Sequence, residues 1–220
     1  MRECFIAPSI LSADFGYLMD EIRAVEGEAE YIHIDVMDGH YVDNLSFGIP
    51  IVQSLRKHTD KILDVHLMIT NPGKFIKPFV DAGADIITFH LECTDDPAAM
   101  SELVRSYGIK SGIAVHPDTP IELILPFVNK TDKILLMTVR PGFGGQGYME
   151  ISDDRIKAVR KAIDEQEGCN TLISCDGGIN RTTAARVYGA GCDILVAGDA
   201  VFRNDDHAKA VRELREITLG

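Results

Sequence analysis

The chain has 220 residues, enough for one large domain or two small ones, and 45% of them are hydrophobic, an ordinary share for a globular core. Its formal net charge is −12 at pH 7, which argues against binding to nucleic acid or to an anionic membrane surface, since both require basic patches. An anionic ligand is not excluded, because backbone amides can hold a phosphate locally.

The sequence carries the signs of an intracellular protein. Its five cysteines are scattered, form no Cys-x-x-Cys pair, and are interpreted as reduced thiols: Cys4, Cys93, Cys169, Cys175 and Cys192. The N-terminus passes directly into strand-like sequence, without a signal-peptide pattern, and no apolar run is long enough to span a bilayer. We therefore expect a cytoplasmic protein.

Apolar, β-rich runs alternate with helical patterns along the whole chain. Most of these runs are almost continuously hydrophobic, which is typical of parallel strands covered on both faces. Eight strands are expected, at residues 4–9, 30–36, 62–68, 84–89, 109–115, 132–138, 171–175 and 192–197.

The stretches between the strands have apolar residues at i, i+3 and i+4, the pattern of amphipathic helices. Asp14 is expected to cap the first helix, and Pro72 suits the first turn of the third. Eight helices are predicted, at residues 14–25, 48–55, 71–81, 97–107, 120–128, 151–165, 180–188 and 205–217.

Eight βα units in 220 residues predict a single-domain (β/α)8 TIM barrel over residues 1–220. An internal echo supports a repeated unit, because residues 83–85 and 191–193 both place a glycine after a helix and an aspartate before a strand. A doubly wound open sheet is the structural alternative. No Gly-x-Gly-x-x-Gly follows the first strand, so the usual dinucleotide signature is missing.

Polar residues gather at the expected C-terminal strand ends, where TIM-barrel enzymes carry their active sites. His33 and Asp35 share one face of the second strand, because residues two apart point the same way. His66 and Asp176 end the third and seventh strands. Singly, such residues are more often structural hydrogen bonders or helix caps. Together, two imidazoles and two carboxylates predict a site for Zn²⁺, Fe²⁺, Mn²⁺ or Co²⁺.

Glycine-rich loops follow the last three expected strands, at residues 140–146, 176–178 and 197–199. Glycine lets backbone amides approach a ligand closely. The loops after the seventh and eighth strands form the recurrent phosphate site of such barrels. A tight turn explains any one of these loops, whereas the three together favour a phosphate cradle.

This arrangement suits inversion at a carbon next to a carbonyl. A metal polarises a carbonyl and stabilises the adjoining enediolate. Asp35 and Asp176 lie well apart around the expected ring, so one can remove a proton from one face while the other returns one to the opposite face. Near strand ends, Met37, Met68 and Met137 suit a soft cap over an enediolate, although methionine also serves as core filler.

Five stretches of the chain, in order, resemble the ribulose-phosphate 3-epimerase family: residues 7–15, 33–39, 64–68, 141–146 and 176–178. The resemblance implies a (β/α)8 barrel that interconverts D-ribulose 5-phosphate and D-xylulose 5-phosphate, a step of the pentose phosphate pathway. It also implies one divalent metal ion per subunit and a homo-oligomer, a dimer or larger.

The resemblance further assigns roles to residues of this chain. It implies that Asp35 and Asp176 form the acid–base pair and that the metal ligands are His33, Asp35, His66 and Asp176. Ser9, His66 and Asp176 would touch the substrate. Its phosphate would lie against the residues of the glycine loops, namely Gly142, Phe143, Gly144, Gly145, Gly177, Gly178, Gly198 and Asp199.

Three positions depart from the family's usual pattern. Asp199 stands where a small Ser or Thr commonly follows the last strand's glycine, and a carboxylate beside a phosphate is unfavourable unless it turns away. His116 and Arg140 stand where Asn is frequent, and Arg140 is expected to supply a charge that offsets Asp199. These changes leave open D-allulose 6-phosphate, or another ketose phosphate, as the substrate.

Two other classes of protein compete with an epimerase. Phosphate-binding barrels that cleave or decarboxylate, such as aldolases and the orotidine-phosphate decarboxylase group, commonly need a lysine at a strand end. Lys61, Lys110 and Lys133 lie at strand beginnings, and no Asp-x-Lys-x-x-Asp occurs. A non-catalytic phosphosugar-binding barrel is the third interpretation, and nothing in the sequence favours it.

Overall fold

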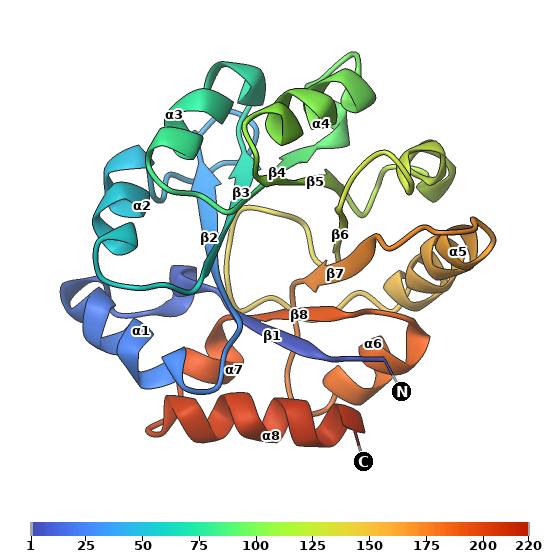
Figure 1. Ribbon diagram of the computed structural model, residues 1–220. Helices are drawn as coiled ribbons and strands as arrows, with labels where there is room; N and C mark the ends of the chain where they lie inside the picture. The colour runs from blue at the N-terminus through green and yellow to red at the C-terminus, as the bar shows by residue number, and fades with distance from the viewer. Residues whose placement is uncertain (1, 220) are drawn as a thin grey trace.

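The computed structural model describes residues 2–219, which form a ring of eight parallel strands surrounded by helices (Figure 1). Neighbouring strands follow the order β1-β8-β7-β6-β5-β4-β3-β2, and a parallel bridge between Ser9 and His33 joins the two edges. The sheet is therefore a nearly closed barrel, and the predicted (β/α)8 fold is confirmed. The strands are β1 (Phe5–Pro8), β2 (Tyr31–Met37), β3 (Ile62–Met68), β4 (Ile86–His90), β5 (Lys110–Val115), β6 (Lys133–Met137), β7 (Leu172–Asp176) and β8 (Ile194–Ala197).

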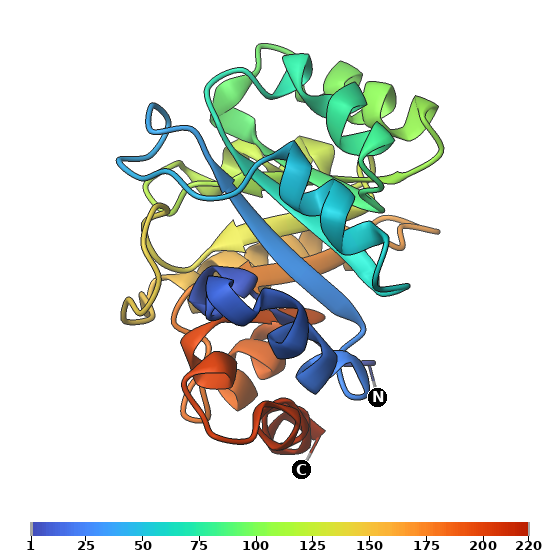
Figure 2. The same cartoon turned by 90° about the vertical axis from the view of Figure 1, so that its left-hand side faces the viewer.

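The helices cover the outside of the ring, and the loops after β2 and β6 project from the same end of the barrel (Figure 2). The α-helices are α1 (Leu18–Glu26), α2 (Ile49–Arg56), α3 (Ile76–Asp81), α4 (Pro97–Ser106), α5 (Ser152–Asp164), α6 (Ala184–Ala190), α7 (Asp199–Phe202) and α8 (His207–Leu219). Short 3-10 turns supplement them: η1 (Ile10–Ser12), η2 (Phe15–Tyr17), η3 (Pro72–Lys74), η4 (Leu91–Cys93), η5 (Ile121–Leu123) and η6 (Leu125–Phe127).

The expected strands are all present, with ends shifted by at most two residues. The helix expected at 120–128 is wrong, because this segment forms the turns η5 and η6. Pro126 lies within it, and proline removes a helical N–H and clashes with the preceding turn. Asp14 caps η2 rather than α1. Between β8 and α8, the four-residue helix α7 was not predicted.

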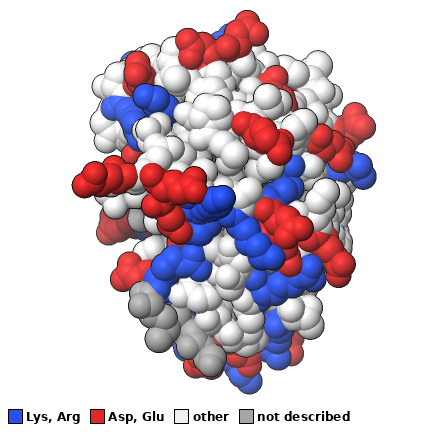
Figure 3. Space-filling model, turned by 90° about the vertical axis from the view of Figure 1, so that its right-hand side faces the viewer, with Lys and Arg blue, Asp and Glu red and all other residues white. Residues whose placement is uncertain are grey.

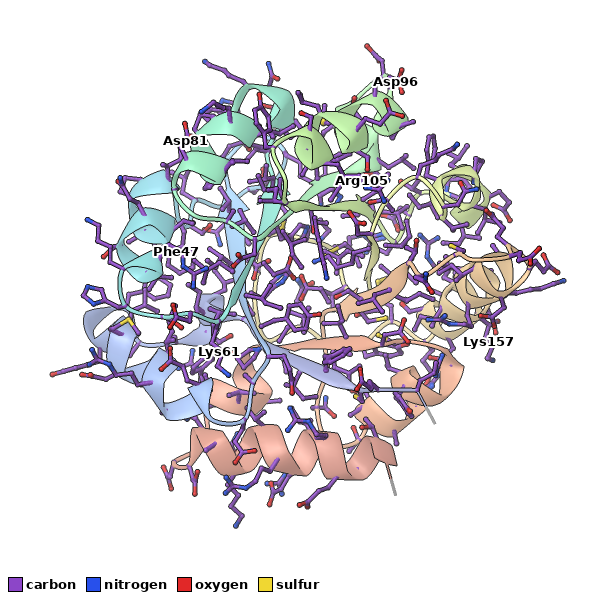
Figure 4. All side chains as sticks on the ribbon, in the orientation of Figure 1. Phe47, Lys61, Asp81, Asp96, Arg105 and Lys157 are labelled. Atoms are coloured by element: carbon purple, nitrogen blue, oxygen red, sulfur yellow. The ribbon has the colours of Figure 1, made fainter. Side chains whose placement is uncertain are left out.

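Side chains alternate between the two faces of the barrel wall, as in any strand. On β2, Ile32, Ile34 and Val36 pack in the large outer core against the helices, on the face opposite His33 and Asp35. The inner face contributes a second, smaller apolar cluster: Ala7, Tyr31, Ile86, Ala114, Leu135, Met137, Val139, Ile194 and Val196. Figure 4 shows side chains filling the space inside the ring, whereas Asp81 on α3 and Lys157 on α5 lie on its outer rim.

The N-terminal end of the barrel repeats one arrangement four times. The acid before each even-numbered strand accepts a hydrogen bond from an amide of the preceding strand: Glu30 from Ile6 (3.3 Å), and Asp85, Asp132 and Asp193 from Leu63, Ser111 and Ile173 (2.8 Å each). Each acid also pairs with an arginine of an outer helix, in the same order Arg215 of α8, Arg56 of α2, Arg105 of α4 and Arg160 of α5. The echo seen in the sequence at residues 83–85 and 191–193 is thus part of a fourfold pattern.

The outer surface mixes charges of both signs. Figure 3 shows acidic and basic side chains interspersed on the side of the barrel that carries α5, so the net charge of −12 is not gathered into one patch on that face. Over residues 2–219, no helix combines the length and apolarity needed to cross a membrane. The five cysteines are free thiols.

Replacing Asp193 by alanine is expected to destabilise the barrel by about 2–4 kcal/mol, because it leaves Arg160 and the amide of Ile173 without their buried partner. Urea denaturation followed by circular dichroism measures the change. Asp154→Ala is the matched control, since its carboxylate on α5 is 89% exposed and pairs with Lys157 alone at 3.3 Å. Equal effects of the two substitutions would show that the repeated acid is not a structural anchor.

Candidate active site

Four polar side chains converge inside the C-terminal end of the barrel. His33 and Asp35 come from β2, His66 from β3 and Asp176 from the end of β7, and one donor atom of each lies within 4.8 Å of the others. Asp35 Oδ1 lies 3.3 Å from His33 Nε2 and 3.1 Å from His66 Nδ1. Asp176 Oδ2 lies 3.8 Å and 3.6 Å from the same two nitrogens. Although β2 and β7 are not neighbours in the ring, their carboxylates meet at one centre.

The two imidazoles are oriented as metal ligands would be. His33 Nε2 faces the cluster and, among the described residues, is a buried nitrogen without a hydrogen-bond partner, while Nδ1 lies 2.9 Å from Asp64 Oδ2. His66 Nδ1 faces the cluster, while its Nε2 lies 2.9 Å from His90 Nε2. Ligating histidines typically have the other ring nitrogen held in this way. The four predicted residues therefore fit a divalent first-row metal ion.

Asp35 is held as a carboxylate. It is only 3% exposed, and burial alone would raise its pKa. His33 and His66 outweigh burial and hold the pKa of Asp35 well below its usual range. Ser9 also donates a 2.6 Å hydrogen bond from its hydroxyl to Oδ2. Ser9, predicted to touch the substrate, thus also orients Asp35.

The other three groups are shifted by the same surroundings. Burial and the neighbouring charge of Asp35 raise the pKa of Asp176 to about 7. Burial would lower the pKa of His33, but the charges of Asp35 and Asp64 raise it to about 10. Burial is the main reason that the pKa of His66 falls to about 4. Strong shifts of this kind are common at functional sites.

A cavity of about 320 Å³ opens above the cluster. Asp35 and Asp176 form part of its floor, whereas His33 and His66 are completely buried and lie outside its lining. The other predicted substrate-binding residues all line it: Ser9, Gly142, Phe143, Gly144, Gly145, Asp176, Gly177, Gly178, Gly198 and Asp199.

Two of the loop positions require glycine. A Cβ on Gly178 would lie 2.4 Å from the backbone nitrogen of Tyr148, and the residue has a φ of +66°. A Cβ on Gly198 would lie 2.5 Å from the Ser12 hydroxyl. These close approaches leave backbone rather than side chains at the cavity wall, which suits recognition of a phosphate by amides.

The three predicted methionines also line the cavity. Met37 and Met68 are register partners on β2 and β3, and Met137 is the partner of Asp176 across β6 and β7. All three are at most 5% exposed. They therefore place polarisable, apolar surface directly beside the carboxylates.

Sequence analysis missed several residues of the site. Ser12, Gln146 and Asn180 line the cavity. Gln146 Nε2 also donates to the carbonyls of Arg140 (2.7 Å) and Phe143 (2.8 Å), which holds the loop after β6 together. Ser12 and Gln146 fall inside stretches that carried the family resemblance, so that signal was available for them.

His90 was missed as well. It ends β4, is completely buried and lies behind His66, and its Nδ1 is 2.8 Å from the hydroxyl of Tyr41. The hydroxyl of Tyr41 lies 3.5 Å from Glu92. A histidine at another C-terminal strand end was the available signal. This chain of contacts fixes the orientation of a predicted ligand.

Arg140 does not offset Asp199, and that expectation was wrong. The Arg140 guanidinium forms two 3.0 Å hydrogen bonds with Asp118 and does not line the cavity. His116 is also outside the lining and accepts a hydrogen bond from the amide of Asp118 at 3.2 Å. Asp199 does line the cavity, with Oδ2 only 2.9 Å from the position of a Cβ on Gly145.

The model of the ribulose-phosphate 3-epimerase family matches residues 5–202. The chain belongs to the ribulose-phosphate 3-epimerase family. It is 48% identical over 210 residues to ribulose-phosphate 3-epimerase of Mycobacterium tuberculosis, covering 96% of this chain and 91% of the relative. It is 46% identical over 211 residues to the enzyme of the same name from Bacillus subtilis, covering 96% of this chain and 97% of that relative.

Solved structures agree on the fold. Orotidine 5′-phosphate decarboxylase from Pyrococcus horikoshii superposes with a TM-score of 0.72 at 15% identity, over 98% of this chain and 99% of that one. At that identity the likeness concerns the barrel alone. This likeness does not support a cleaving or decarboxylating enzyme, which would need a lysine at a C-terminal strand end. Lys133 starts β6, at the opposite end from the cavity-lining residues.

The affinity for a divalent metal ion is expected to decrease as the pH is lowered. Despite its burial, His33 has a pKa of about 10 because of the charges of Asp35 and Asp64, and burial raises the pKa of Asp176 to about 7. A divalent cation must therefore displace protons to bind, and more of them as the pH falls. The logarithm of the Kd for Co²⁺ should therefore rise as pH falls, more steeply below 7. Competition with a chromogenic chelator from pH 5.5 to 8.5 measures this, and a pH-independent Kd would contradict the assignment of these ligands.

Proposed function

We propose that the protein is a ribulose-phosphate 3-epimerase that interconverts D-ribulose 5-phosphate and D-xylulose 5-phosphate. The observation that carries this proposal is the meeting of two imidazoles and two carboxylates at one centre, on the floor of a cavity walled by methionines and glycine loops. Membership of the epimerase family supports the same reaction.

The proposed cofactor is one divalent metal ion per subunit, held by His33, Asp35, His66 and Asp176. Two nitrogen and two oxygen donors suit Zn²⁺, Fe²⁺, Mn²⁺ and Co²⁺ alike. When bound, such an ion polarises the substrate carbonyl at C2 and stabilises the negative charge of an enediolate.

Asp35 and Asp176 exchange protons with C3 of the substrate. One carboxylate takes the C3 proton, and the electrons of the broken C–H bond form the C2–C3 double bond of a cis-enediolate. The other carboxyl then delivers a proton to the opposite face of C3, which inverts this carbon. Without a metal ion the two carboxyls already differ, because His33 and His66 hold the pKa of Asp35 below its usual range despite its burial, whereas burial and the charge of Asp35 raise the pKa of Asp176 to about 7. The reverse reaction exchanges the two roles.

The remaining lining residues bind and shield the substrate. Met37, Met68 and Met137 exclude water from the face of the enediolate. Ser9 and His66 hold Asp35 in place, and Ser9, which lines the cavity, contacts the sugar. The substrate phosphate is held by backbone amides of residues 142–145, 177–178 and 198–199, with Phe143, 59% exposed, at the rim.

Neutralising either catalytic carboxylate is expected to stop the reaction. Asp35→Asn and Asp176→Asn should each lower kcat by at least about a hundredfold, because an amide cannot transfer the proton. The measurement is loss of the C3 proton signal of ribulose 5-phosphate in D₂O by NMR, with the metal content of each variant determined in parallel. Asp43→Asn, an exposed carboxylate on the loop after β2, is the control.

The same assay separates the competing functions. D-allulose 6-phosphate is run beside ribulose 5-phosphate, and a higher kcat/KM for the hexulose would replace the proposed substrate. Proton exchange by the Asp35→Asn or Asp176→Asn variant at the wild-type rate would reject the two-acid mechanism. Binding of both sugars without exchange by the wild-type protein would identify a non-catalytic phosphosugar-binding barrel.

Asp199 is expected to weaken phosphate binding, because its carboxylate lines the phosphate end of the cavity and Arg203, 3.9 Å away, is 72% exposed. Asp199→Ser should lower KM by roughly five- to tenfold with little change in kcat, since the repulsion acts equally on the ground and transition states. Steady-state kinetics at low salt measures this. The exposed Asp205 provides the control Asp205→Ser, and an unchanged or higher KM for Asp199→Ser would show that Asp199 faces away from the phosphate.

We also propose that the protein works in the cytoplasm as a homo-oligomer, a dimer or larger. The free cysteines support a reducing compartment. Large apolar side chains on the loops after β1 and β2 support assembly, since Phe15, Tyr17 and Leu45 are 55%, 66% and 74% exposed.

A further inference from the structure

A buried chain of three side chains lies beneath the metal-ligand cluster. Lys133 of β6 donates a hydrogen bond from Nζ to Asp64 Oδ1 on β3, and Asp64 Oδ2 lies 2.9 Å from His33 Nδ1 on β2. Lys133 is 2% exposed, and Asp64 and His33 are completely buried. A lysine from the N-terminal end of the barrel is thus connected to the proposed active site at the other end.

The barrel interior is shaped to let Lys133 reach this position. Its stem must pass β5, where Gly112 leaves the space open. A Cβ on Gly112 would lie 3.0 Å from Lys133 Cε and 2.4 Å from the hydroxyl of Thr88 on β4. Asp64 lies on β3 directly beside His33 of β2, because the two residues are register partners in the β2–β3 pairing. The path from Lys133 to His33 therefore depends on an absent side chain at position 112.

The pair controls which nitrogen of His33 is available. A carboxylate only accepts hydrogen bonds, so the contact with Asp64 requires that His33 Nδ1 carries the hydrogen. In the neutral ring that binds a metal ion, this leaves the lone pair on Nε2, the atom that faces the cluster, 3.3 Å from Asp35 Oδ1. The Lys133 ammonium can only donate hydrogen bonds, and it forms a buried ion pair with the Asp64 carboxylate. Its charge also balances Asp64, so that the charges of Asp35 and Asp176 together match a divalent cation.

We propose that Lys133 and Asp64 are positioning residues that hold His33 in the tautomer and orientation in which Nε2 binds the metal ion. This inference rests on the proposed metal-dependent function and concerns metal affinity rather than the proton transfer. Neither residue touches the cavity. Their hydrogen-bonded contact with the cluster is through His33, so their effect on metal affinity is measurable without substrate.

The two residues are expected to behave as one unit. In Asp64→Asn, Lys133 still donates a hydrogen bond to the side-chain carbonyl oxygen of the new amide. The amide NH₂ group then faces His33 Nδ1, which must accept a hydrogen bond, so the ring hydrogen moves to Nε2. The Kd for Co²⁺ should rise by roughly 100-fold. In Asp64→Asn/Lys133→Met, the amide is free to turn its carbonyl toward His33, and the Kd should return to within about tenfold of the wild-type value. A second substitution that restores affinity is not expected of residues that merely stabilise the fold.

The measurement is chelator competition for Co²⁺ with the full-length protein, together with the ¹¹³Cd–¹⁵N coupling of the Cd²⁺-loaded protein, which identifies the ring nitrogen that binds. His33 should couple through Nε2 in the wild type and in Asp64→Asn/Lys133→Met, and this coupling should be lost in Asp64→Asn. Lys110→Met is the matched control, because Lys110 starts β5 at the same end of the barrel and is exposed. Its Kd should equal that of the wild type.

A variant with both polar groups removed covers the case in which Asp64→Asn does not fold. Asp64→Leu/Lys133→Met replaces the buried pair by apolar side chains, a change that often preserves stability. It removes the acceptor for Nδ1, so the Kd should rise by roughly 10- to 100-fold while the protein stays folded. A wild-type Kd in this variant, or a double variant Asp64→Asn/Lys133→Met that binds no better than Asp64→Asn, would overturn the proposal.

These experiments distinguish failure of the positioning role from failure of the proposed function. Wild-type metal affinity in Asp64→Asn, in a protein that epimerises ribulose 5-phosphate, would reject the positioning role alone. The expected pattern of Kd values in a protein without epimerase activity would reject the proposed reaction and retain the positioning role. A wild-type protein that binds no divalent metal would overturn both.

Discussion

The structure depends on burying two carboxylates and two imidazoles side by side at one end of a barrel. Buried charges are costly unless each has a partner. Asp35 is held by Ser9 and His66, and Asp64 by His33 and Lys133. Asp176 is the carboxylate whose pKa stays raised, to about 7. A positive charge at the centre would stabilise the ionised form of Asp176, and a divalent cation bound by the four residues supplies that charge.

The two ends of the barrel divide stability from chemistry. At the N-terminal end, four acids anchor the even-numbered strands to the amide of the strand before and to an arginine of a helix, so polar groups there satisfy one another. At the C-terminal end, polar groups face a cavity, and His33 Nε2 has no hydrogen-bond partner among the described residues. Parallel strands make this division possible, because every strand presents the same end to the same side.

Phosphate recognition in the proposed function relies on backbone rather than on charged side chains. Arg140, the cation nearest in sequence to the glycine loop, is paired with Asp118 outside the cavity. Asp199 adds a negative charge to the lining. Gly178 and Gly198 allow the chain to lie close to Tyr148 and Ser12, which leaves backbone rather than side chains at these two points of the cavity wall. A net charge of −12 is therefore compatible with an anionic substrate.

Patterns along the sequence predicted the fold and the four residues that meet at the centre. Near-continuous apolar runs predicted the strands, since both faces of a parallel barrel wall are buried. Period-two alternation placed His33 and Asp35 on one face, and strand ends located His66 and Asp176. These features are local, because they depend on the direction of a side chain along its own strand. Segment 120–128 was the exception, where one proline outweighed an apolar pattern.

The contacts that side chains make across the barrel could not be predicted without the folded structure. Lys133 lies at a strand beginning, yet its stem crosses the interior past Gly112 to Asp64. His90 lies behind His66, and Arg140 turns to Asp118. These contacts join residues 22 to 69 positions apart in the chain. Long flexible side chains and non-neighbouring strands set them, and no periodicity in the sequence encodes either one. For that reason the proposed ligands were predictable and the residues that hold them were not.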